Sequence, residues 1–141
     1  MTRIDFYSNV PDKIQYACRL VRKARAANCR LVVFGQDRAQ LAQIDEALWT
    51  FSDIDFLPHV MADDPLAEQT PVLLADAGMK DLPHHDLMIN LSNQTPPDFA
   101  RFERLLEVIS AEDEDKAAGR ERYRFYQQRG YPLSHFVADK T

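Results

Sequence analysis

The chain has 141 residues, of which 45% are hydrophobic and 28% are charged, and its net charge is −5. This length suits one domain, residues 1–141, that buries a core, and the composition excludes an intrinsically disordered chain. A globally acidic protein is also a poor general nucleic-acid binder, because attraction to phosphate depends on the summed field of the protein.

The start of the sequence and its apolar runs bear on where the protein acts. The first residues, Met1-Thr2-Arg3-Ile4-Asp5, reach an acidic side chain before any long apolar stretch, which is not typical of a signal peptide. No run approaches the ~18 apolar residues that a membrane span needs. We therefore expect a cytoplasmic protein that does not bind a membrane.

Short apolar runs alternate with helical periodicity along the chain. The first half predicts, in chain order, a strand at 4–7, a helix at about 9–27, a strand at 31–34 and a helix at about 37–51. An irregular surface excursion follows at 52–71. The second half predicts strands at 72–75 and 87–90, a short helix after Pro96-Pro97, a strand at 105–109 and a last helix that ends near Gly130. This alternation predicts an α/β fold of three layers, in which a mostly parallel central sheet of about five strands has helices on both faces.

Three helix starts carry capping signals. Asn9 is expected to cap the first helix, with Pro11 in its first turn, and Asp37 the second helix. Ser110, with Asp113 three residues later, resembles a capping box for the last helix. The acidic residues 112–115 then lie in the first turn of that helix, where its dipole favours negative charge.

Sites for nucleotides, metals and catalysis are not indicated. The four glycines stand in neither of the spacings that cradle a polyphosphate. In His84-His85-Asp86, adjacent side chains of an extended segment would point to opposite faces, so these are interpreted as solvated polar residues. His59 is interpreted as a hydrogen-bonded loop residue, and Cys18 and Cys29 as small buried thiols. We therefore expect no cofactor, no metal ion and no enzymatic activity.

The second helix contains a tryptophan away from its core-facing side. The apolar residues of this helix gather on one arc at 100° per residue: Leu41, Ile44, Leu48 and Phe51. Trp49 lies about 130° from the centre of that arc. Either the excursion at 52–71 covers this side chain, or it is an anchor for a protein partner.

The last helix contains a stripe of like charges. Lys116, Arg120 and Arg124 are spaced i, i+4 and i+8, and Tyr123 flanks them next to Gly119, whose missing side chain lets a ligand approach. Such a stripe is either a solvated face or a site for an acidic ligand. An acidic ligand would relieve the repulsion between the cations, which costs a few tenths of a kcal/mol per pair.

Several short blocks of the sequence resemble the chi subunit of bacterial DNA polymerase III. The blocks are Asp45-Glu46-Ala47-Leu48-Trp49, Phe56-Leu57-Pro58-His59, and Arg120-Glu121-Arg122-Tyr123 continuing through Tyr126 to Gly130. Their order and spacing agree along nearly the whole chain, and the strands at Phe6-Tyr7 and Leu87–Ile89 fit as well. The resemblance implies a non-catalytic accessory protein of the clamp loader. It would pair with the psi subunit, bind the acidic C-terminal tail of single-stranded DNA-binding protein, and contact nucleic acid mainly indirectly.

The resemblance also implies which residues bind each partner. Carried over residue by residue, the acidic-tail site falls on the following positions: Lys116, Arg120, Tyr123 and Arg124, with Ile109 as a pocket wall. The surface for psi falls on Trp49 and Phe56, and a repair helicase is expected to compete for it. Residues 134–141 do not match the expected ending, and Arg124 stands where a lysine is expected.

Two alternatives of other classes stay open. One is a direct single-stranded DNA-binding module that uses the first helix, because residues 12–30 hold six basic side chains and one acid. The other is a degenerate nucleotide enzyme on the same sheet.

Overall fold

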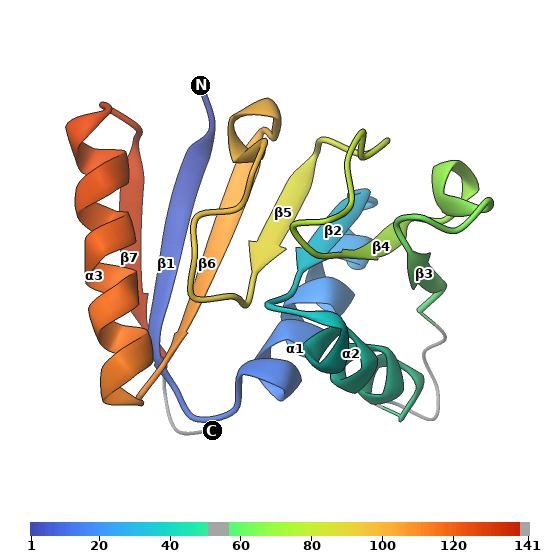
Figure 1. Ribbon diagram of the computed structural model, residues 1–141, viewed down its shortest axis with the longest axis horizontal. Coiled ribbons are helices and arrows are strands. Elements are labelled where there is room, and N and C mark those ends of the chain that lie inside the picture. Colours follow the sequence, from blue (N-terminus) through green and yellow to red (C-terminus); the bar gives the residue numbers. More distant parts are fainter. Residues whose placement is uncertain (51–56, 139–141) are drawn as a thin grey trace.

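The computed structural model describes residues 1–50 and 57–138, in which one seven-stranded sheet is flanked by three α-helices (Figure 1). The strands are β1 (Arg3–Val10), β2 (Leu31–Phe34), β3 (His59–Met61), β4 (Val72–Ala75), β5 (Leu87–Asn90), β6 (Arg104–Ser110) and β7 (Leu133–Val137). The helices are α1 (Lys13–Ala26), α2 (Arg38–Thr50) and α3 (Asp113–Gln128), with short 3₁₀ turns at Ala67–Gln69 and Phe99–Arg101. The sheet order is β3-β4-β2-β5-β6-β1-β7, and its pairings are parallel.

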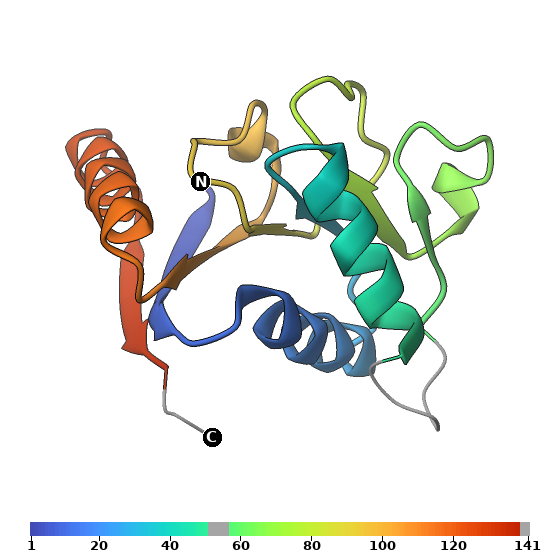
Figure 2. The same cartoon turned by 60° about the horizontal axis from the view of Figure 1, so that its bottom comes forward.

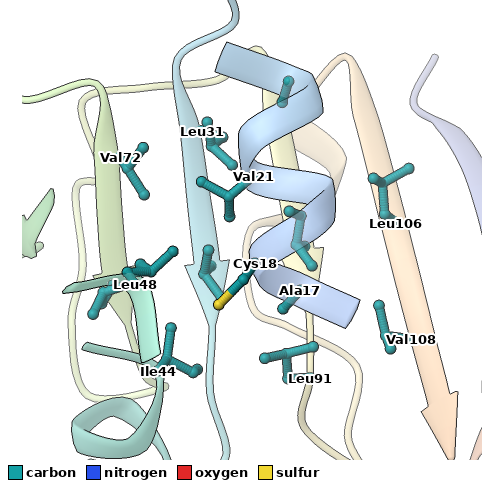
Figure 3. Close-up of a cluster of buried hydrophobic side chains, with 14 of the residues drawn as sticks. Ala17, Cys18, Val21, Leu31, Ile44, Leu48, Val72, Leu91, Leu106 and Val108 are labelled. Carbon is teal, nitrogen blue, oxygen red and sulfur yellow. The ribbon is translucent and has the colours of Figure 1, made fainter. Parts of the chain in front are cut away.

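Different helices cover the two faces of the sheet (Figure 2). α1 and α2 cover one face, and α3 covers the other beside β1 and β6. Because successive side chains of a strand point to opposite faces, Val108 of β6 belongs to the α1/α2 core and Ile109 belongs to the α3 core. Figure 3 shows the first of these cores, where Val21 of α1 lies near Leu31 of β2. The predicted α/β fold with helices on both faces is confirmed.

The number of strands differs from the expected five. β3 and β7 were not predicted, and they form the two edges of the sheet. β3 lies in the stretch that was expected to be irregular, and it has only three residues. β7 pairs with β1 in the register Ile4 to Leu133.

Two of the three helix caps were predicted wrongly. β1 continues to Val10, so Asn9 lies near the end of the strand with φ 56° instead of capping a helix. The cap of α1 is Asp12, whose Oδ1 accepts a hydrogen bond from the Gln15 N–H at 3.1 Å. α3 begins after Glu112, and Ser110 does not form the expected capping box.

The cap of α2 and the short helix were predicted correctly. Asp37 Oδ1 accepts from the Gln40 N–H at 2.9 Å. The short helix expected after Pro97 is the 3₁₀ turn Phe99–Arg101. Within residues 1–50 and 57–138, no helix is both long and apolar enough to cross a bilayer.

Candidate functional site

A pocket of about 650 Å³ opens between α3 and the sheet edge formed by β1 and β7. From α3 it is lined by Lys116, Gly119, Arg120, Tyr123, Arg124 and Gln127. From the strands it is lined by Phe6, Ser8, Asn9, Ile109, His135 and Val137. The lining residues include Lys116, Arg120 and Arg124 and no acidic side chain. This pocket therefore suits a ligand that is negatively charged.

The floor of the pocket is apolar because α3 approaches β6 closely. A Cβ atom added to Gly119 would lie 2.5 Å from Cδ1 of Ile109, so only glycine fits here without a shift of the isoleucine. The rings of Tyr123 and Phe6 meet edge to face with centroids 5.0 Å apart. On the strand side, Ser8 Oγ lies 2.7 Å from His135 Nε2, which joins β1 to β7. An apolar floor below a cationic rim can bind an apolar group that is attached to an anion.

A buried polar cluster fixes α3 on the sheet. Glu107 of β6 is fully buried, and its Oε1 accepts from Asn90 Nδ2 at 2.9 Å and from Arg122 Nε at 3.2 Å. Its Oε2 accepts from the Tyr126 hydroxyl at 2.6 Å. Burial raises the pKa of Glu107, and the opposing effect of the Arg122 guanidinium is smaller. Because Arg122 must point inward to reach this carboxylate, the cations two positions before and after it point to the other side of the helix.

A second ion pair holds the start of α3. Asp115 Oδ2 lies 3.1 Å from Lys13 Nζ of α1 and accepts from the Ser110 N–H at 2.7 Å. Burial acts to raise the pKa of Asp115. The hydrogen bond from Ser110 and the Lys13 ammonium outweigh burial, so the pKa is lowered. The Asp115 carboxylate therefore links the start of α3 to the Ser110 backbone and to α1.

The structure brings all the residues predicted for acidic-tail binding into this one pocket: Ile109, Lys116, Arg120, Tyr123 and Arg124. The sequence did not predict the strand residues that complete it. Phe6 was assigned only to a strand, Ser8 lies just after the predicted strand at 4–7, and His135 and Val137 belong to β7. Residues 133–137 do not alternate apolar and polar side chains, so the sequence carries no strand signal for this wall.

Trp49 lies on another part of the molecule, and 54% of its surface is exposed. Its ring centroid is 4.8 Å from that of His59, whose Nε2 lies 3.0 Å from Asp45 Oδ1. The expected position of Trp49 outside the core is confirmed, and the structure leaves its proposed role in binding untested. Phe56, the other residue predicted for this surface, lies outside the described residues.

Two of the histidines differ from their sequence interpretation. His59 is hydrogen-bonded, with Nδ1 2.6 Å from the Leu57 carbonyl oxygen, but it lies in β3 and not in a loop. His84 is buried and not solvated, because its Nε2 lies 2.6 Å from the Thr70 carbonyl oxygen. Among residues 1–50 and 57–138, no group of three or more potential metal ligands comes together.

Comparison with known proteins identifies the family. The family model described as DNA polymerase III chi subunit, HolC, matches residues 1–134. The chain belongs to this family. It is 35% identical over 139 residues to the DNA polymerase III subunit chi of Pseudomonas aeruginosa, with 94% of each chain covered. The subunit chi of Haemophilus influenzae is 28% identical over 120 residues, covering 85% of this chain and 83% of that one.

A solved structure agrees with the fold. The chain aligns with the crystal structure of the Escherichia coli DEAD-box protein SrmB bound to regulator of ribonuclease activity A, with a TM-score of 0.65. The alignment covers 99% of this chain and 93% of that one, at 14% identity, and it shows the fold alone.

Membership of the chi family makes this chain a replication accessory subunit of DNA polymerase III and not an enzyme. The family match ends at Ser134, inside β7. His135 and Val137, which line the pocket, therefore lie beyond the matched region.

Proposed function

We propose that this chi subunit is a single-domain cytoplasmic adaptor of the clamp loader, with two protein-binding surfaces. The pocket under α3 binds the acidic C-terminal tail of single-stranded DNA-binding protein. The surface around Trp49 binds the psi subunit, and a repair helicase competes for it.

The main support for the tail site is the composition of the pocket. Three cations surround an apolar floor, and none of the lining residues is acidic. An acidic peptide is attracted by this local positive field although the whole chain carries −5. The apolar floor suits an apolar or aromatic side chain at the end of such a tail, packed beside Ile109 and Tyr123.

Arg120 is the residue expected to bind the terminal carboxylate. It is the middle cation of the stripe, one helical turn from both Lys116 and Arg124. A guanidinium can donate two parallel hydrogen bonds to a carboxylate, which an ammonium cannot do. Lys116 and Arg124 would then interact with the acidic residues that precede the end of the tail.

Calorimetry with a synthetic acidic peptide tests this site. The Arg120→Ala variant is expected to bind at least tenfold more weakly, because an unpaired desolvated carboxylate costs about 2–5 kcal/mol. Arg120→Lys should recover only part of this loss. The matched control is Arg129→Ala. It removes an exposed cation that directly follows α3 and lies outside the pocket.

Further measurements separate the terminal carboxylate from general charge attraction. A peptide with an amidated C-terminus should lose affinity for the wild type and not for Arg120→Ala. Affinity should also fall as salt is raised, because exposed charges beyond ~8–10 Å are screened at physiological ionic strength. Wild-type affinity in Arg120→Ala, or a larger loss in Lys116→Ala, would show that the site is assigned wrongly.

The psi surface is supported by the half-exposed ring of Trp49. Because 54% of the Trp49 surface is exposed, Trp49→Ala should change the free energy of unfolding little. Loss of an aromatic anchor should weaken partner binding by ~2–4 kcal/mol. Pull-down with purified psi and a thermal melt of the same variant check both expectations. A loss of several kcal/mol in stability would instead make Trp49 a structural residue.

A further inference from the structure

Three aromatic side chains lie together on the face of the β1–β7 edge opposite the pocket. The rings of Tyr7 and Phe136 are stacked, with centroids 5.4 Å apart and an angle of 23° between their planes. Tyr16 of α1 continues the series, with its centroid 5.7 Å from that of Tyr7. Phe136 is 50% exposed. We name these three residues the aromatic stack.

The aromatic stack is on the other face because of the strand alternation. Phe6 and Val137 line the pocket under α3, so their neighbours Tyr7 and Phe136 point away from it. Tyr7 and Tyr16 pack instead against the α1/α2 core. The two faces of one sheet edge therefore carry two separate surfaces.

Cations lie next to the aromatic stack along α1. The guanidinium carbon of Arg19 lies 5.6 Å from the centroid of the Tyr16 ring. Arg19 and Lys23 are exposed, and with Tyr16 they follow the i, i+3, i+7 spacing of one helix side.

Basic groups continue toward the start of β1. Arg3 lies on the same face of β1 as Tyr7, and Arg104 of β6 is its partner in the strand register. Burial raises the pKa of Tyr7, and the Arg104 and Arg3 cations oppose this shift. Asp5 shares this face of β1 with Tyr7. It is buried and accepts a hydrogen bond from Arg104 Nη2 at 2.7 Å, so its charge is compensated. The surface as a whole therefore combines flat apolar rings with positive charge.

We propose that this surface binds single-stranded nucleic acid directly, with bases stacked on Phe136 and phosphates beside Arg19 and Lys23. Aromatic rings accept any base because every base has a flat face, and neighbouring cations neutralise the backbone. A duplex cannot use such rings, since its bases are already stacked inside the helix. This proposal does not depend on binding of an acidic tail, because the two surfaces lie on opposite faces.

Fluorescence anisotropy with a labelled oligo(dT) of about 12 nucleotides, within the usual range of single-strand sites, tests the proposal. The double variant Arg19→Glu/Lys23→Glu is expected to bind at least tenfold more weakly. Lys80→Glu/Arg129→Glu, which reverses two exposed cations outside this surface, is the charge-matched control and should bind like the wild type. With Arg19→Ala/Lys23→Ala, the slope of log affinity against log salt should flatten by about 0.7 for each phosphate that the variant no longer neutralises.

The role of the rings is tested by Phe136→Leu, which keeps an apolar side chain on the edge strand and removes the flat face. Loss of stacking on one base corresponds to about a five- to hundredfold weaker affinity. A thermal melt checks that Phe136→Leu is folded. Phe136→Tyr, which keeps a flat ring, should bind like the wild type. The same measurement with oligo(U) shows whether single-stranded RNA or DNA is bound more tightly. Binding of either one supports the proposal if these substitutions weaken it as expected.

Several results would overturn it. One is equal affinity for a duplex of the same length. Another is an equal loss in Lys80→Glu/Arg129→Glu, which would mean that only net charge matters. A third is displacement of the oligonucleotide by an acidic tail peptide, which would place the nucleic acid in the pocket under α3.

Discussion

Replacing Gly119 with alanine tests whether close contact between α3 and β6 forms the floor of the pocket. Alanine is favoured over glycine inside a helix by about 1 kcal/mol. The new Cβ would, however, lie 2.5 Å from Ile109 Cδ1 and 3.1 Å from its Cγ1. Overpacking of a well-filled core costs about 1–3 kcal/mol. The net expectation is a loss of stability of about 0–2 kcal/mol, together with a displaced isoleucine and weaker binding of an acidic peptide.

A second substitution separates the steric effect of the new methyl group from the higher helix propensity of alanine. Ile109→Val removes Cδ1 and by itself should cost about 0.5–1.5 kcal/mol. In the double variant the alanine methyl group enters the space that Cδ1 leaves, so Gly119→Ala becomes stabilising in this background. Urea denaturation of the four proteins measures the coupling, which should be at least about 1 kcal/mol. Additive single changes would mean that α3 and β6 are not in close contact at Gly119, and the account of the pocket floor would then be wrong.

Two further predictions concern ionisable groups. Because the folded-state pKa of Asp115 is lowered, its stabilising effect is present above its unfolded pKa and is lost as pH falls through the folded value. Asp115→Asn should therefore be less stable than the wild type by about 1–2 kcal/mol at pH 7. In urea melts this difference should shrink as the pH falls below about 5, and a constant difference would contradict the assignment. Burial raises the pKa of Cys18 to about 11, so iodoacetamide at about pH 8 should modify Cys29 and leave Cys18 intact, as mass spectrometry can measure. Two adducts on the native protein would mean that the Cys18 thiol is accessible.

The central strands were predicted from sequence because each is a short run of apolar residues. Residues 31–34, 72–75 and 87–90 are buried on both faces, and their bounds agree with the prediction. The edge strands were missed for the opposite reason. β7 is mostly exposed, and the adjacent polar residues Ser134 and His135 break the alternation that would indicate a strand. Only its pairing with β1, which is distant in sequence, makes it a strand.

The helical part of the site could be predicted because it depends on local periodicity. Lys116, Arg120 and Arg124 share one side of α3 by spacing alone. Their sequence gives no sign that Arg122, which alternates with them, is buried against Glu107. Asn9 was expected to be a helix cap because Pro11 follows it, and the sequence does not reveal that β1 continues to Val10. The strand wall of the pocket likewise depends on pairing between residues far apart in the chain.

The place of β1 in the sheet has a consequence for how the protein is made. Both neighbours of β1 come from the other end of the chain, since Ile4 pairs with Leu105 and with Leu133. At a synthesis rate of ~5–20 residues per second, β1 leaves the ribosome roughly 5–20 s before β6 does. During that interval the apolar side chains of Ile4 and Phe6 have no strand beside them. Assembly of this edge thus waits for nearly the whole chain, and a nascent chain that ends before β7 cannot present the pocket.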